Sequence, residues 1–326
     1  MRYFTIFSIL SVLSYTYLIE NIGVEDKNRS NVTFIVGEDT DSENQYYAAA
    51  KKYYCTHDID NQSIVIDTCR SLVAIQQFLQ MYPTKDNKAW GKINIVAHGN
   101  EWTGLKLSIM PNVKERVNTT TLKNALNNDL LKDLKNCKTI DAFTQLHIKG
   151  CAVGKDEALL NLMKQAFGGR LKVFSPEKFV IYQPDNQCYL ADYFYSFHNP
   201  DSSFNIEKSV QELKQRYPTT PLNWKSILSE NTEGGVTNPF VYHFKIPIRW
   251  TINFPDTMQV PKFPNPQGLQ FEDWLFDQKP LMATLEKTNL PKKAFRWVYD
   301  TAGSSLKIYG VCQVVCVLKP EETMAF

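Results

Sequence analysis

The feature that most constrains the fold of this chain is a regular alternation between residues 31 and 175 of short apolar runs with segments of helical character. The apolar runs are residues 32–36, 63–66, 92–97, 145–150 and 171–174, and the helical segments between them are residues 43–54, 70–81, 119–134 and 155–167. Strands that alternate with helices favour a parallel sheet that is covered by helices on both faces. The sequence therefore predicts an α/β domain over residues 30–185.

The second half of the chain has a different pattern, because the alternation stops near residue 186. The proline-rich residues 254–267 indicate turns and extended loops. The remaining patterns predict strands over residues 240–254 and 306–318 and helices over residues 206–216 and 281–288. Residues 186–326 are therefore expected to form an α+β C-terminal region, and no motif in it assigns a role.

The N-terminus has the pattern of a secretory signal peptide, with Arg2 followed by an apolar stretch over residues 3–19. This stretch is short for a membrane span of about 20 residues. We expect a signal peptide over residues 1–22 and a secreted or periplasmic protein. The alternative is a buried N-terminal strand or helix in a cytoplasmic protein, and a membrane is an expected partner only if the segment is retained.

Composition and motifs exclude several functional classes. The net charge of +2 gives no electrostatic argument for nucleic acid. The seven cysteines contain no CxxC pair, which argues against a structural zinc site. No GxGxxG follows the first apolar run and no GxxxxGK[ST] occurs, so the nucleotide-binding motifs are absent from the sequence. We therefore expect neither a metal nor an organic cofactor.

His98 and Cys151 directly follow the third and fourth apolar runs. Consecutive strands of a parallel sheet are often neighbours, so their ends would bring the two side chains together. A thiol attacks as its thiolate, and an imidazole can take the thiol proton. Gly99 and Gly150 flank the pair, and the amides of Gly99 and Cys151 are candidate oxyanion donors. Either residue alone would be read as a buried cysteine or a structural histidine, but the pair predicts a nucleophilic site.

The blocks that hold this pair, IVAHG at residues 95–99 and HIKGCAVG at residues 147–154, resemble the catalytic blocks of caspase-like cysteine peptidases. That clan includes caspases, gingipains, legumains, clostripains and the self-cleaving domains of large bacterial toxins. The two residues are 53 positions apart (151 minus 98), close to the roughly 50 of caspases. The resemblance covers about residues 30–185 and implies a caspase-like parallel sheet sandwiched by helices. It further implies His98 as acid and base, Cys151 as nucleophile and Gly99 as an oxyanion donor.

Other side chains are candidates for a substrate pocket. Trp102 follows the histidine closely and is a candidate wall of a subsite. Ser175, Glu177 and Gln183 follow the fifth run, where the resemblance places part of the primary specificity pocket. Glu177 would favour a basic substrate residue, with a solvated loop charge as the alternative. The caspase block QAC[RQG]G is absent, so specificity for aspartate is not implied.

The group that orients His98 is left open by the sequence. Asp39 follows the first apolar run and Asp67 ends the second. Both lie at the edge of the predicted sheet that carries the histidine, and either is a candidate partner for the imidazole. Acidic residues are also common in loops at strand ends, which is the alternative interpretation of both.

The leading hypothesis is a thiol protease, a hydrolase in which Cys151 attacks a peptide carbonyl and His98 shuttles protons. An acyl-thioester intermediate is then hydrolysed, and self-processing is a further expectation from the resemblance. The substrate is a peptide or protein. The alternative is a non-catalytic caspase-like domain for binding or assembly, because GCAVG is also similar to a block in a domain of bacterial surface adhesins. A different thiol enzyme, such as an acyltransferase, is a third hypothesis. An enzyme should expose Cys151, whereas a binding domain should bury it.

Overall fold

The computed structural model describes residues 29–39, 45–57, 63–229 except 114, 133 and 184, 241–255, 273–275, 277, 282, 285, and 292–318 except 301 and 303. The expected signal peptide over residues 1–22 lies outside these residues, and so does most of the helix expected over residues 281–288. No helix of the described residues is both long and apolar enough to cross a membrane.

The first half of the chain forms a parallel sheet of five strands in the order β2-β1-β3-β6-β7. The strands are β1 (Asn31–Ile35), β2 (Ser63–Ile66), β3 (Lys92–Val96), β6 (Gln145–Lys149) and β7 (Lys172–Phe174). Each one falls on a predicted apolar run, and the α/β fold class is confirmed. The strands at the centre are almost completely buried because helices cover both faces of the sheet.

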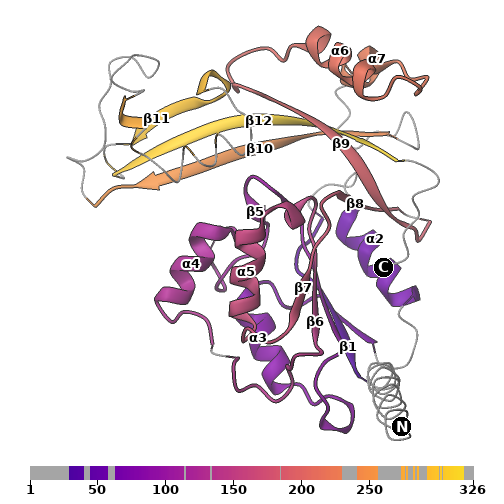
Figure 1. Cartoon of the computed structure of the whole chain (residues 1–326), viewed down its shortest axis with the longest axis vertical. Helices are drawn as coiled ribbons and strands as arrows, with labels where there is room; N and C mark the ends of the chain where they lie inside the picture. The colour runs from indigo at the N-terminus through magenta and orange to yellow at the C-terminus, as the bar shows by residue number, and fades with distance from the viewer. Residues whose placement is uncertain are drawn as a thin grey trace, which may run out of the picture.

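Helices lie on both faces of this sheet (Figure 1). One apolar cluster joins the sheet to α3 (Leu72–Met81), α4 (Thr119–Asn127) and α5 (Glu157–Ala166). A second cluster joins the opposite face to α2 (Tyr46–His57). Helix α4 is shorter than the predicted 119–134. It ends at Asn127, and the next residues form a turn in which Asp129 has a positive φ of 52°.

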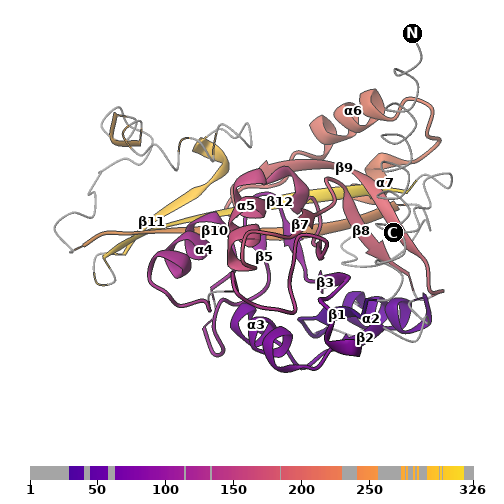
Figure 2. The same cartoon turned by 60° about the horizontal axis from the view of Figure 1, so that its bottom comes forward.

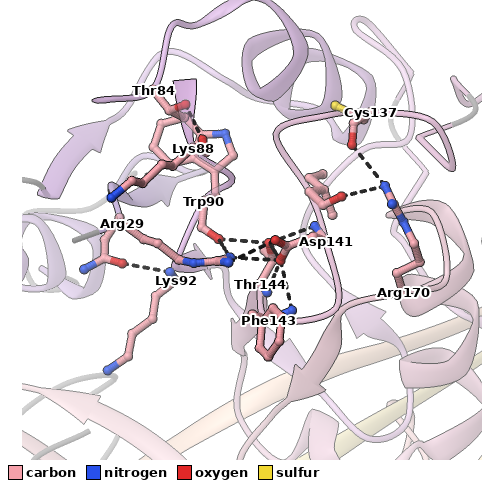
Figure 3. Close-up of polar contacts among 12 residues, drawn as sticks. Arg29, Thr84, Lys88, Trp90, Lys92, Cys137, Asp141, Phe143, Thr144 and Arg170 are labelled. Atoms are coloured by element: carbon pink, nitrogen blue, oxygen red, sulfur yellow. Dashed lines mark hydrogen bonds and ion pairs between the residues drawn. The ribbon is translucent and has the colours of Figure 1, made fainter. Parts of the chain in front are cut away.

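The amino-terminal edge of the sheet is held by polar contacts, which Figure 3 shows. The buried Arg29 guanidinium donates to both carboxylate oxygens of Asp141, at 2.8 and 3.0 Å. The Thr144 hydroxyl donates to the Trp90 carbonyl at 2.9 Å. Arg170 donates to two carbonyls of the loop that precedes β6. These contacts lie at the amino-terminal ends of the strands, whereas His98 and Cys151 follow their carboxyl ends.

The second half forms an antiparallel sheet in the order β10-β12-β9-β8, with β11 also paired to β12. Its strands are β8 (Phe179–Tyr182), β9 (Cys188–His198), β10 (Val241–Asn253), β11 (Arg296–Asp300) and β12 (Ser305–Val317). Its helices are α6 (Ile206–Arg216) and α7 (Trp224–Ser229), and a short 3-10 turn at Lys292–Ala294 precedes β11. Another 3-10 turn, at Lys85–Asn87, lies in the first half of the chain. The sequence missed β8 and β9, and the expected boundary at residue 185 falls in the turn between them.

The antiparallel sheet lies across the carboxyl ends of the parallel strands, as both views show (Figures 1 and 2). Its outer face is covered by α6 and α7 through a cluster that includes Leu213, Trp224 and Val315. Its inner face shares an apolar cluster with Trp102, Cys151 and Ala152. The second half therefore packs directly on the edge of the sheet where the candidate site lies.

Candidate active site

The two candidate catalytic residues extend from neighbouring strands that are in register. Val96 of β3 pairs with Lys149 of β6, and the Ala97 amide donates to the Lys149 carbonyl at 3.4 Å. His98 and Cys151 are each two positions beyond this last pair, at the carboxyl edge of the sheet. The structure thus brings both residues to the ends of two adjacent parallel strands.

His98 is held by aromatic residues from α2. The Tyr46 ring stacks on its imidazole with ring centroids 4.3 Å apart, and the Tyr47 ring meets it edge-on at 4.8 Å. The His98 amide donates to the Tyr47 hydroxyl at 3.0 Å, and the His98 carbonyl accepts from the backbone amide of Lys106 at 2.6 Å. Burial, and secondarily the charge of Lys106, lowers the pKa of His98 to about 4. The imidazole is therefore a neutral base at neutral pH.

Cys151 is buried in this structure. Its exposed fraction is 8%, and it belongs to the apolar cluster between the two sheets. The thiol donates to the Val180 carbonyl of β8 at 3.7 Å. Burial raises its pKa to about 12. A 3-10 turn over Val153–Lys155 separates it from α5, which begins at Glu157, so the helix dipole does not offset this burial.

The His98 ring and the Cys151 thiol form no hydrogen bond with each other among the described residues. The two pKa values, about 12 and about 4, differ by about 8. Proton transfer from the thiol to the imidazole is therefore unfavourable in this arrangement. In this structure the thiol is therefore protonated and the imidazole is neutral at neutral pH.

The segment between β7 and β8 lies against the turn that carries Cys151. The Ala152 amide donates to the Lys178 carbonyl at 2.9 Å, and the Gly154 amide donates to the Pro176 carbonyl at 2.9 Å. Ala152 adopts a left-handed conformation with φ 53°, which costs an alanine about 1 kcal/mol. A Cβ on Gly154 would lie 2.5 Å from the Ser175 carbonyl oxygen. The close approach of the two segments therefore requires glycine at position 154.

Side chains fill the space next to the two glycines that flank His98 and Cys151. Gly99 lies in β4 (Gly99–Asn100), which pairs with β5 (Gly104–Leu105). A Cβ on Gly99 would lie 2.9 Å from a Val153 methyl carbon, and one on Gly150 would lie 2.7 Å from a Leu105 methyl carbon. In this arrangement the space beside both glycines is filled by these two side chains, and not left for a substrate backbone.

The four candidate pocket residues have different environments in the structure. Trp102 is buried at 6% exposure between the two halves and meets Tyr195 edge-on at 5.0 Å. The Ser175 hydroxyl donates to the Ile148 carbonyl at 3.0 Å. Glu177 is exposed to solvent, and the Gln183 amide donates to the Tyr242 hydroxyl at 2.7 Å.

The two candidate orienting carboxylates have other partners. Asp39 accepts from the amides of Tyr47 and Ala48, at 3.0 and 2.9 Å, and so caps the first turn of α2. It forms no hydrogen bond with the imidazole, although its charge opposes the fall in the pKa of His98. Asp67 pairs with Lys51 at 2.6 Å, and this contact lowers the pKa of Asp67. Tyr46 and Tyr47 contact His98 instead, and the sequence missed them because an aromatic pair in a helix is typical of core packing.

A polar network connects the antiparallel sheet to the two segments of the site, the one that follows His98 and the one that follows Cys151. The Tyr193 hydroxyl of β9 donates to Glu101 at 2.6 Å and accepts from the Lys155 ammonium. Lys155 and Glu101 also form an ion pair at 3.7 Å. Glu101 lies three residues after His98 and Lys155 four residues after Cys151. Burial, together with Glu101, raises the pKa of Tyr193, so the phenol remains neutral and keeps its proton for this contact.

Within the described part of the chain, no three His, Cys, Asp or Glu side chains gather as a metal site. In comparisons with known proteins, no family model, no curated protein and no solved structure matches the chain. The functional conclusion therefore depends on the residues of the site and their contacts.

Proposed function

We propose that this protein is a cysteine endopeptidase with Cys151 as nucleophile and His98 as general base and acid. The observation that carries the proposal is the in-register placement of the two residues at the ends of β3 and β6. The carboxyl edge of a parallel sheet is where such folds hold their chemistry. His98 is neutral at neutral pH and so has a free site for a thiol proton, but its low pKa makes it a weak base in this arrangement, so the proposed reaction requires a more solvated imidazole.

In the proposed reaction, the thiolate adds to a peptide carbonyl, and His98 gives the proton to the departing amine. Water then attacks the resulting thioester, with His98 taking its proton, and the acid product leaves. The structure buries Cys151, which by the criterion drawn from the sequence favours a binding domain, so the proposal requires that the described arrangement is a latent form. Separation of the antiparallel sheet from the two loops would restore water to the thiol and lower its pKa toward the ordinary value.

The second candidate function, a binding or assembly domain without catalysis, is favoured by one specific observation. Cys151 lies in an apolar cluster with residues of the antiparallel sheet, such as Phe179 and Cys316. A buried cysteine of this kind is often a small packing residue. The two functions differ in what happens once the site is opened.

The experiment uses a Tyr193→Phe variant to weaken the network that holds the sheet on the site. Alkylation of Cys151 is followed by mass spectrometry in this variant, with and without His98→Ala. Hydrolysis of a mixture of unfolded peptides is measured in parallel, with Cys151→Ala as the control for contaminating proteases.

For an endopeptidase, opening increases peptide hydrolysis, and this gain is lost in both Cys151→Ala and His98→Ala. The alkylation of Cys151 is also at least tenfold slower without His98, because the thiolate forms less readily. For a binding domain, opening accelerates alkylation equally with and without His98, and no peptide is cleaved. That second result would overturn the proposal.

A further inference from the structure

The imidazole of His98 is fixed by contacts that come from one helix. Tyr46 lies nearly parallel to the ring, with an angle of 27° between the planes, and Tyr47 meets it at 72°. The two tyrosines are consecutive, at the first two positions of α2. Stacked and edge-on contacts together restrict both the tilt and the rotation of the imidazole.

The hydroxyls of these tyrosines anchor the helix to both catalytic strands. The Tyr47 hydroxyl accepts from the His98 amide at 3.0 Å. The Tyr46 hydroxyl donates to the Lys149 carbonyl at 3.1 Å, two residues before Cys151. This carbonyl also accepts the 3.4 Å bond from Ala97, the last bond between the two strands. Tyr46 therefore spans the junction of the strands that carry the two candidate catalytic residues.

Neighbouring residues make room for the two tyrosines and hold the start of their helix. A Cβ on Gly37 would lie 2.1 Å from the Tyr47 ring, so glycine two residues after β1 provides the space for the ring. Asp39 holds the first turn of α2 through the Tyr47 and Ala48 amides. Tyr46 meets Tyr182 of β8 at 5.4 Å, and burial raises the pKa of Tyr46, so its hydroxyl stays a donor.

We propose that Tyr46 and Tyr47 are the positioning residues of His98, and that this aromatic pair performs the orienting role for which the sequence offered only Asp39 and Asp67. The inference rests on the proposed function for its catalytic meaning. The positioning itself is a property of the imidazole and can be measured without catalysis.

The titration of His98 is a direct readout of this positioning, since the groups that face it are known. Tyr46 and Tyr47 from α2 contact the ring, and the charges of Asp39 before α2, Lys106 after β5 and Arg116 before α4 act on its pKa. Burial of the ring is the largest cause of its low pKa. Loss of the stacked tyrosine would admit water to the imidazole and raise its pKa from about 4 toward the ordinary 6.5.

The experiment is a histidine titration by NMR in a Cys151→Ala background, in which no reaction can occur. Tyr46→Leu removes the stacked ring and the hydroxyl, whereas Tyr46→Phe keeps the ring. Tyr53→Leu is the matched control, because Tyr53 stacks on His57 in the same helix with a nearly identical geometry, 4.4 Å and 25°.

The pKa of His98 is expected to rise by about one unit or more in Tyr46→Leu, a tenfold change in proton affinity. It should stay within about 0.3 units of the parent in Tyr46→Phe and Tyr53→Leu. An unchanged titration in Tyr46→Leu would overturn the proposal. Should that variant not fold, Tyr47→Phe, which removes only the acceptor of the His98 amide, must broaden or shift the His98 ring signals, and unchanged signals would overturn it as well.

The same substitutions, made with Cys151 intact in the Tyr193→Phe protein, separate this inference from the proposed function. Both hold if Tyr46→Leu shifts the pKa of His98 and also removes the His98-dependent part of Cys151 alkylation, with Tyr46→Phe restoring it. A shifted pKa with alkylation that never depends on His98 would support the positioning and refute the peptidase.

Discussion

The burial of Cys151 leads to a quantitative prediction for the Tyr193→Phe substitution. The structure raises the pKa of this thiol from an ordinary 9 to about 12. At neutral pH this lowers the thiolate fraction about 1,000-fold, and alkylation requires the thiolate. In the parent protein, Cys151 should therefore be alkylated at least 1,000-fold more slowly than the exposed Cys55, which calibrates each reaction.

The Tyr193 hydroxyl links the antiparallel sheet to the segments that follow His98 and Cys151, through its 2.6 Å bond to Glu101 and its contact with Lys155. A hydrogen bond to a charged group contributes about 1.5–3 kcal/mol. The lower value applies, because Lys155 and Glu101 remain paired at 3.7 Å without the hydroxyl. A loss of about 1.5 kcal/mol in the closed state increases the open population, and hence the alkylation rate of Cys151, about tenfold.

Tyr195→Phe is the matched control. Tyr195 lies two residues further along β9, on the same face of the strand, and its hydroxyl forms no hydrogen bond among the described residues. Both substitutions remove one phenol hydroxyl, but Tyr195→Phe breaks no hydrogen bond to the site. The alkylation rate of Cys151 should therefore change less than twofold in this control. The assay is site-resolved mass spectrometry of a time course at constant pH. Equal rates in the two variants, or parent Cys151 reacting within tenfold of Cys55, would refute the reasoning.

Three further predictions concern stability and use urea unfolding as the measurement. Burial holds the pKa of both His98 and His147 at about 4, so the unfolded chain binds protons between pH 6.5 and 4 that the folded chain does not. The free energy of unfolding should therefore fall as the pH falls through this window, by about 3 kcal/mol for each histidine, and a stability that is flat from pH 7 to 4 would contradict this. Gly154→Ala should cost about 2 kcal/mol or more, because its Cβ would meet backbone atoms at 2.5 Å. Gly169→Ala, at φ 78° with no atom within 4 Å, should cost only about 1 kcal/mol, and equal costs would argue against the close approach. Asp141→Asn should cost about 2–4 kcal/mol, since it leaves a buried guanidinium without its carboxylate, and a loss below about 0.5 kcal/mol would show that the pair is not formed.

Local sequence was enough to predict the parallel sheet and the positions of His98 and Cys151. Each strand is a short apolar run, and each candidate residue directly follows such a run, so both assignments depend only on neighbouring positions. The strands of β10 and β12 and the helix α6 were predicted for the same reason. Strand β9 was missed, although its tyrosines and phenylalanines are typical of a strand.

The chemical state of the site was decided by tertiary structure alone. The residues that bury Cys151 come from the antiparallel sheet, which includes β8, and Cys316 of that sheet is 165 positions away (316 minus 151). The tyrosines that hold His98 come from α2, which is 51 positions away for Tyr47. Burial and pKa depend on every group packed around an atom, and these groups are brought together only by folding. The sequence therefore determined where the two residues lie, and the packing of the second half on the first determined that the thiol is covered.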